Sequence, residues 1–230
     1  MTRASDGRAR RWWWWLLCAS AIGVAGRSSF VLLAPGTIAF LSARHGWTRT
    51  TLVVHALTGA AALLAGLVQL QTGPERPRRA LHRALGRLCV LAMVAASLSG
   101  GALAMSTRGG VAARAGFLVL SLLWLFTTTR AVLAIRAGHM ASHRMWMLRA
   151  FALTFSAVTL RVYLGLGVAF GLRFLEVYAL SAWLCWVPNL LLVEWWWLPR
   201  SASGSGDRGV SRRDWVTMMH TTGTTKQPAV

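Results

Sequence analysis

The sequence predicts an all-α integral membrane protein, a bundle of six transmembrane helices with its N- and C-termini in the cytoplasm. Of the 230 residues, 55% are hydrophobic and only 13% are charged, whereas soluble domains usually carry about 25% charged residues. Long apolar segments alternate with clusters of arginine, a pattern typical of helices that cross a bilayer and end in charged loops. This composition excludes an ordinary soluble domain.

The strong positive charge is best explained by the membrane. A net charge of +19 would indicate nucleic-acid binding in a soluble protein. Here the arginines lie at the ends of apolar segments, so we expect no nucleic-acid partner. The partners that we expect are the lipid bilayer and the anionic headgroups on its cytoplasmic side. The only lysine is Lys226, which excludes a retinal-type Schiff base inside the membrane.

Six apolar segments are long enough to span a bilayer. Residues 1–11 form a basic cytoplasmic N-terminus, residues 12–197 the transmembrane domain, and residues 198–230 a disordered cytoplasmic tail rich in Ser, Gly and Thr. The expected spans are about Trp12–Leu33, Thr51–Leu70, Leu81–Met105, Val111–Ile135, His143–Leu166 and Arg173–Trp197.

Helix-breaking residues set the boundaries of these spans. Pro35 and Gly36 end the first span, and residues 34–49 form either a loop or a re-entrant segment. The polar loop Gln71–Arg79 and the turn Ser106–Gly110 enclose the third span. Pro188 predicts a kink in the sixth span, because proline lacks the N–H that a helix needs.

The distribution of arginine sets the orientation. Arginine-rich and arginine-poor loops alternate along the chain, and this alternation fits six spans but not five or seven. The positive-inside rule therefore places both termini in the cytoplasm.

Two histidines are candidates for cofactor binding. His82 and His143 both lie at the cytoplasmic ends of their predicted helices, so they share a depth. Gly86 lies one turn after His82 on the same face and lets a flat macrocycle or a neighbouring helix approach closely. Two imidazoles that face each other across a bundle are what a b-type haem requires. The alternative is that both histidines pair with lipid phosphates or loop carbonyls.

A second polar group is expected near the outer edge. His55, Arg161 and Glu176 lie at similar depths on three different spans and form either a small-ligand site or an Arg–Glu ion pair. Near the cytoplasmic edge, Glu194 is expected to form a structural ion pair with an arginine such as Arg87. No other metal site is expected beyond haem iron.

The remaining motifs are uninformative about catalysis. The three cysteines, Cys18, Cys89 and Cys185, lie in apolar segments without a CxxC pair and are expected to be small buried hydrophobes. The chain has no phosphate-binding loop, hydrolase elbow or zinc-protease motif. The sequence therefore leaves open whether the protein is an enzyme.

Several motifs together resemble a family of bacterial membrane proteins called "domain of unknown function 2306". The most specific are Arg79-x-x-His82-Arg83-x-x-Gly86-Arg87 and His143-Arg144-x-Trp146-Met147-x-Arg149, with Thr159-Leu160-Arg161 and a closing Trp183-x-x-Trp186-x-x-Asn189. The resemblance covers about residues 52–197. It implies a multi-pass protein of the bacterial inner membrane and no established activity.

A more distant analogy concerns the di-haem transmembrane ascorbate cytochromes, which have six helices. In them, helices three and five supply one histidine pair, which corresponds to His82 and His143 here. Helices two and four supply the other pair; His55 corresponds to half of it, and the fourth span has no histidine. The leading hypothesis is an electron-transfer protein with one haem b. The alternative is a non-enzymatic transporter of small solutes or lipids, or a structural subunit of a membrane complex.

Overall fold

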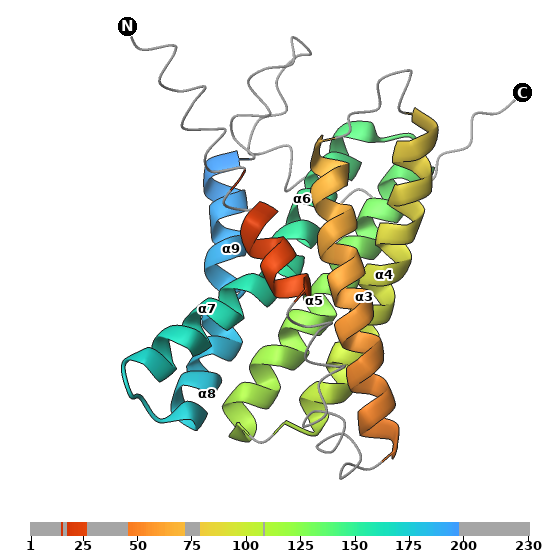
Figure 1. The fold of residues 1–230 in the computed structure, drawn as a ribbon. Coiled ribbons are helices and arrows are strands. Elements are labelled where there is room, and N and C mark those ends of the chain that lie inside the picture. The colour runs from red at the N-terminus through yellow and green to blue at the C-terminus, as the bar shows by residue number, and fades with distance from the viewer. Residues whose placement is uncertain (1–14, 16–17, 27–45, 72–78, 108, 198–230) are drawn as a thin grey trace, which may run out of the picture. The chain divides into compact units, whose positions relative to one another are not determined.

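The computed structural model describes residues 15, 18–26, 46–71, 79–107 and 109–197, and this part of the chain is helical without any strand (Figure 1). Residues 18–26 form a short helical stretch. The longer elements are α3 (Gly46–Gln71), α4 (Arg79–Met105), α5 (Gly110–Arg136), α6 (Met140–Thr154), α7 (Ser156–Ala169), α8 (Phe174–Leu184), α9 (Val187–Leu192) and the π-helix η2 (Val193–Trp197).

Five segments of the described chain are long and apolar enough to cross a membrane. They are Trp47–Gln71, Ala80–Met105, Gly110–Arg136, Met140–Ala169 and Phe174–Trp195. These segments correspond to the second to sixth predicted spans, which confirms the all-α membrane class. Most of the first predicted span, the 34–49 segment up to residue 45 and the C-terminal tail lie outside the described residues. The count of six spans and the orientation stay predictions.

Four helices form a closed bundle. α3 packs against α4, α4 against α5, α5 against α6, and α6 returns to α3. In this order α4 and α6 occupy opposite corners, and so do α3 and α5. α8 packs on the outer side of α5, and α7 packs against α8. Because α4 and α6 run in the same direction through the bundle, their first turns lie at the same end (Figure 1).

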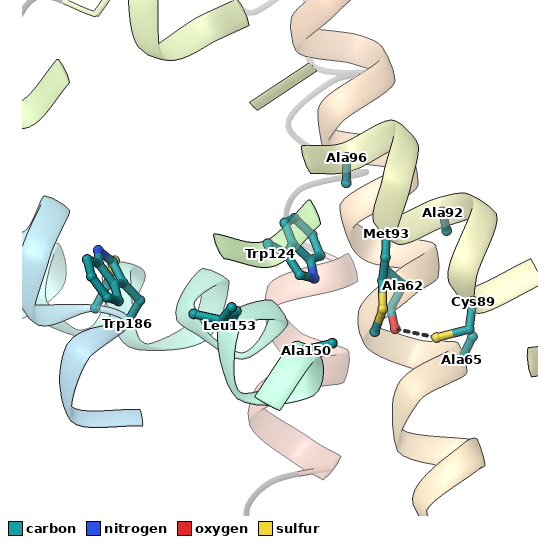
Figure 2. Packing of buried hydrophobic residues seen from close by; sticks show 11 residues of the cluster. Ala62, Ala65, Cys89, Ala92, Met93, Ala96, Trp124, Ala150, Leu153 and Trp186 are labelled. Carbon is teal, nitrogen blue, oxygen red and sulfur yellow. Dashed lines mark hydrogen bonds between the residues drawn. The ribbon is translucent and has the colours of Figure 1, made fainter. Parts of the chain in front are cut away.

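The bundle core is built mainly from small side chains. Figure 2 shows alanines of α3, α4 and α6 around Met93 and Trp124, with Leu153 and Trp186 beside them. The Sγ atom of Cys89 lies 3.8 Å from the carbonyl oxygen of Ala62 on α3. Small residues let helix backbones approach closely, and this close approach drives helix association in a membrane. Cys89 and Cys185 are fully buried and free, as expected.

The short stretch 18–26 belongs to a second apolar cluster. Ala21 is fully buried there with Leu63 and Leu67 of α3 and Val158 of α7. The described part of the first predicted span is therefore helical and packs against α3 and α7.

Glycine ends two of the helices. Gly138 follows α5 with a φ of +78°, and Gly171 follows α7 with a φ of +66°. In each turn the next amide reaches back five residues, from His139 to the carbonyl of Ala134 (2.9 Å) and from Leu172 to that of Gly167 (2.9 Å). Side chains rarely adopt this left-handed conformation, so glycine is the residue that fits both turns.

The fifth predicted span is two helices rather than one. It begins earlier than expected, at Met140, and it is interrupted at Phe155 between α6 and α7. The hydroxyls of Thr154 and Ser156 donate to the carbonyls of Ala150 (2.8 Å) and Leu153 (2.6 Å). Such back-bonding competes with the helical ladder and bends helices. The fifth span, predicted at about His143–Leu166, is therefore present as one membrane-spanning segment, Met140–Ala169, with an interruption that the sequence analysis did not predict.

The sixth predicted span is also interrupted, as Pro188 predicts. α8 ends at Leu184, four residues before the proline, and α9 begins at Val187. Proline cannot donate to the carbonyl of the residue four positions earlier, and its pyrrolidine clashes with that carbonyl. The first compact unit of the chain ends at Leu191, and the described residues 192–197 belong to a second unit.

Candidate functional site

His143 is held by a hydrogen bond to a neighbouring helix. Its Nδ1 atom lies 2.8 Å from the backbone carbonyl oxygen of Ala131 on α5. A carbonyl oxygen only accepts, so Nδ1 carries the hydrogen and Nε2 keeps its lone pair in the neutral imidazole. Histidines that bind metals commonly donate their other N–H to a backbone carbonyl in this way.

His143 also lies on the side of α6 that faces the core. The residues one, two and three turns after it are Met147, Ala150 and Thr154. Met147 packs against the core cluster, and Ala150 and Thr154 are buried. Positions i, i+4, i+7 and i+11 share one face of a helix, so His143 continues the core-facing side of α6 to its end.

His82 occupies the equivalent position on α4. The same spacing leads from it through Gly86 to Cys89 and Met93, both of which are fully buried in the core. His82 is half-buried, and its backbone carbonyl accepts a hydrogen bond of 2.7 Å from the Nε2 atom of Gln69 on α3. The two histidines therefore lie on opposite corners of the bundle, at the same end and on core-facing sides.

The space beside Gly86 is not open. A methyl group added at Gly86 would lie 3.5 Å from the Nε2 atom of Gln69. Of the two neighbours expected at Gly86, a flat macrocycle or another helix, the structure places a side chain of α3 there. The glycine lets the Gln69 amide lie across α4 and reach the His82 carbonyl one turn away. Sequence reasoning missed this role of Gln69, because no spacing rule connects residues on different helices.

His55 lies against α4 nearer the other end of the bundle. Its Nδ1 atom is 2.9 Å from the carbonyl oxygen of Ala96. A methyl group added at Gly100 would lie 3.0 Å from the Cε1 atom of His55, so Gly100 makes room for the imidazole. The charge of Arg161 acts on His55 electrostatically. The grouping of His55 and Arg161 into one site stays a prediction.

The third member of that cluster, Glu176, is elsewhere. Its carboxylate pairs with Arg173, with 2.9 Å between Nη1 and Oε1, and both side chains are largely exposed. The guanidinium of Arg161 donates to the carbonyl of Ala157, one turn earlier on α7 (2.7 Å). Helical side chains point toward the N-terminus of their own helix. Arg161 therefore points away from the turn that holds Glu176, and the expected Arg161–Glu176 pair is corrected to an Arg173–Glu176 pair.

The pair expected between Glu194 and Arg87 stays a prediction. Glu194 lies in η2, in the second compact unit, and Arg87 is exposed on α4 in the first unit. A π-helix often occurs at functional positions. Glu194 is one of the two acidic residues in the described part of the chain, and the other is Glu176.

Asn189 connects the two helix interruptions. Its Nδ2 atom donates to the carbonyl of Cys185 at the break before Pro188 (2.9 Å) and lies 3.3 Å from the carbonyl of Ala152, just before the break at Phe155. It also lies 2.9 Å from the Oγ1 atom of Thr159 on α7. An amide with two donors satisfies carbonyls that broken helices leave free. Pro188 was the only sequence signal for this connection.

Trp124 places a polar atom in the apolar core. The side chain is 7% exposed, and its indole N–H has no hydrogen-bond partner among the described residues. Figure 2 shows the indole among Met93, Ala150 and Leu153. A buried donor without an acceptor costs about 1–3 kcal/mol. The described residues contain no group of three or more His, Cys, Asp or Glu side chains arranged to hold a metal ion.

Comparison with known proteins gives one match. The model of the family described as "Predicted membrane protein (DUF2306)" matches residues 52–197. These residues include α4 to α8 and nearly all of α3, and thus the whole of the four-helix core. No curated protein and no solved structure matches the chain.

Proposed function

Because the chain belongs to the family of predicted membrane proteins called DUF2306, we propose a function inside the bilayer: it binds one b-type haem through His82 and His143 and transfers electrons. The proposal includes a location in the bacterial inner membrane with both termini in the cytoplasm. The family description itself assigns a membrane location and no reaction.

The observation that carries this proposal is the paired placement of the two histidines. α4 and α6 occupy opposite corners of the closed bundle, and each histidine begins the core-facing row of its helix at the same end. Cofactor sites in helical bundles are built from side chains on facing helices in this way. Haem iron needs one ligand from each side of a flat macrocycle, and opposite corners supply ligands from opposite sides.

The hydrogen bonds around the histidines support the same assignment. Ala131 holds Nδ1 of His143, so that Nε2 is the nitrogen available as a ligand. Gln69 fixes the backbone of α4 at His82. The unpartnered indole N–H of Trp124 is a further donor for a group bound in the core. At Gly86 the Gln69 side chain of α3 occupies the space, so the haem would lie on the core side of the histidines and not against this glycine.

A bound haem would supply a single iron that alternates between the ferric and ferrous states. The chain's own residues would orient the two imidazoles and exclude water from the core. The arginines around this end of α5 and α6, among them Arg130, Arg144 and Arg149, would favour gain of an electron, because nearby positive charge stabilises the state with lower net charge.

The decisive experiment is a visible spectrum of the full chain. Protein expressed with sufficient haem and purified in detergent should show a Soret band and, after reduction, a sharp α-band. His82→Ala and His143→Ala should each lose both bands. His139→Ala is the matched control, because His139 is exposed just before α6. Colourless wild-type protein, or variants that keep the bands, would overturn the proposal.

A second candidate function rests on a different observation. Two interrupted helices that are joined by Asn189 resemble the discontinuous helices that line substrate sites in transporters. The chain would then move a small solute or a lipid. To test lipid movement, full-length protein is placed in vesicles that contain a fluorescent phosphatidylcholine, and an external quencher is added. Wild-type protein should increase the rate at which the fluorescence is quenched, and Asn189→Leu should lower that rate. Transport equal to that of protein-free vesicles would exclude lipid movement.

A further inference from the structure

A tryptophan at one end of the bundle is contacted by two guanidinium groups. The Cζ atom of Arg130 on α5 lies 5.4 Å from the ring centroid of Trp146 on α6, and that of Arg149 lies 4.6 Å from it. Phe126, one turn before Arg130, packs edge-on against the same indole, with ring centroids 5.6 Å apart. The Trp146, Arg130 and Arg149 side chains are half-buried, and we call these three residues the arginine–tryptophan cluster.

The arginine–tryptophan cluster brings two positive charges together on one indole. No hydrogen bond or ion pair engages the Arg130 guanidinium among the described residues. A cation–π contact leaves the N–H donors of a guanidinium able to bond other groups. Of the two acids in the described residues, Glu176 is paired with Arg173.

The position of the cluster along the helices matches a lipid headgroup. Arg130 lies six residues before the end of α5 at Arg136, which corresponds to about 9 Å along the helix axis. Closer to the middle of α5, one and two turns before Arg130, the side chains of Phe126 and Leu122 are 52% and 59% exposed. Exposed apolar side chains in a membrane span face lipid, so acyl chains would lie along them. The positively charged arginines would then lie at the level of the phosphate to which those acyl chains are attached.

We propose that the arginine–tryptophan cluster binds the phosphate of an anionic phospholipid, whose acyl chains lie along Phe126 and Leu122. Arginine suits this role because its planar fork matches phosphate oxygens, and Trp146 holds the fork in place before binding. The site depends on neither haem nor transport. It is adjacent to the proposed haem ligand, since Ala131, which binds His143, follows Arg130 directly in α5.

The test compares lipids with the same acyl chains. Full-length protein in detergent should show a saturable rise in its thermal unfolding temperature with phosphatidylglycerol and a much smaller one with phosphatidylcholine. Inorganic phosphate and glycerol phosphate are the arms for a free anion, and they should have no effect at the same concentration. A response to these soluble anions equal to that of the lipid would overturn the assignment to a lipid.

Variants locate the site. Arg130→Gln should weaken the apparent affinity for phosphatidylglycerol about fivefold, equivalent to about 1 kcal/mol for one arginine near the membrane surface. Arg136→Gln removes the same charge from an exposed position on the same helix and should leave the affinity within about twofold of wild type. Equal losses in both variants would show only a general charge effect and would overturn the proposal.

Arg130→Lys keeps the test informative if Arg130→Gln does not fold. Lysine keeps the charge but loses the planar fork and its stacking on Trp146. We expect its affinity for phosphatidylglycerol to fall below that of wild type, whereas an affinity equal to that of wild type would contradict a positioned arginine. The unfolding temperature and the affinity for phosphatidylglycerol are measured without the visible spectrum. A colourless protein would therefore refute the haem proposal without affecting the test of the lipid site.

Discussion

His143 and Ala131 join α6 to α5 through a hydrogen bond of 2.8 Å between the imidazole Nδ1 and the backbone carbonyl oxygen. The residue before Ala131 is Arg130, which stacks on Trp146, and Trp146 lies one turn after His143. A half-buried histidine and a half-buried cationic cluster therefore share one helix contact. A change at this contact is expected to affect both proposed sites, which is why their tests use different readouts.

The first prediction concerns topology. Six spans with both termini in the cytoplasm require that the segment containing residues 18–26 also crosses the membrane. An alkaline phosphatase fused to the C-terminus should then be inactive, because this reporter works only after export. A fusion placed in the turn between α7 and α8, at Gly171, should be active. An active C-terminal fusion would contradict the orientation that the arginine distribution predicts.

The second prediction uses two glycines as a matched pair. A methyl group at Gly116 would lie 2.9 Å from the backbone carbonyl oxygen of Ala182 on α8, whereas one at Gly86 makes an ordinary contact with Gln69 at 3.5 Å. Gly116→Ala must displace α8 from α5 and should cost about 1–3 kcal/mol. Gly86→Ala should leave the thermal unfolding temperature in detergent unchanged or slightly raised. The reverse order would refute the close approach of α5 and α8.

The third prediction tests the connection between the helix breaks. Asn189→Leu removes the amide that binds the carbonyls of Cys185 and Ala152 and the hydroxyl of Thr159. The expected loss is about 1–2 kcal/mol, since single hydrogen bonds in membrane helices average about 0.6 kcal/mol. Thr129→Val is the control, because its exposed hydroxyl bonds only within α5, to Leu125. Unfolding in detergent measures both, and equal effects would contradict a special role for Asn189.

The fourth prediction concerns the outer charges. Arg161 and Glu176 do not pair in the structure, so the effects of Arg161→Leu and Glu176→Leu on stability should add within about 0.3–0.5 kcal/mol. Glu176→Gln alone should cost well under about 1 kcal/mol, because its partner Arg173 is also exposed and solvent screens the pair. The Arg161→Leu/Glu176→Leu double variant is the critical case. If it loses less stability than the sum of the two single variants, the result would support the ion pair that the sequence suggested.

The sequence alone predicted the helical elements well. Apolar length and arginine clusters identified the α3, α4 and α5 segments to within about five residues at each end, since burying a helix in lipid requires such a length. Pro188 predicted the interruption after Leu184, because the effect of proline is confined to its own helix. The interruption at Phe155 escaped prediction, because serine and threonine bend a helix only when their hydroxyls bond backward.

The candidate site was likewise predicted only in part. Spacing along one helix was enough to place His82 and His143 on corresponding faces at the same end, because helix geometry is periodic. Which groups meet across helices was decided by tertiary structure: Gln69 of α3 covers Gly86 of α4, and Asn189 joins the two breaks. Those contacts depend on the rotation and separation of neighbouring helices. In a membrane these are set by close packing of small residues such as Gly116, Ala150 and Gly100, and one-dimensional spacing does not encode them.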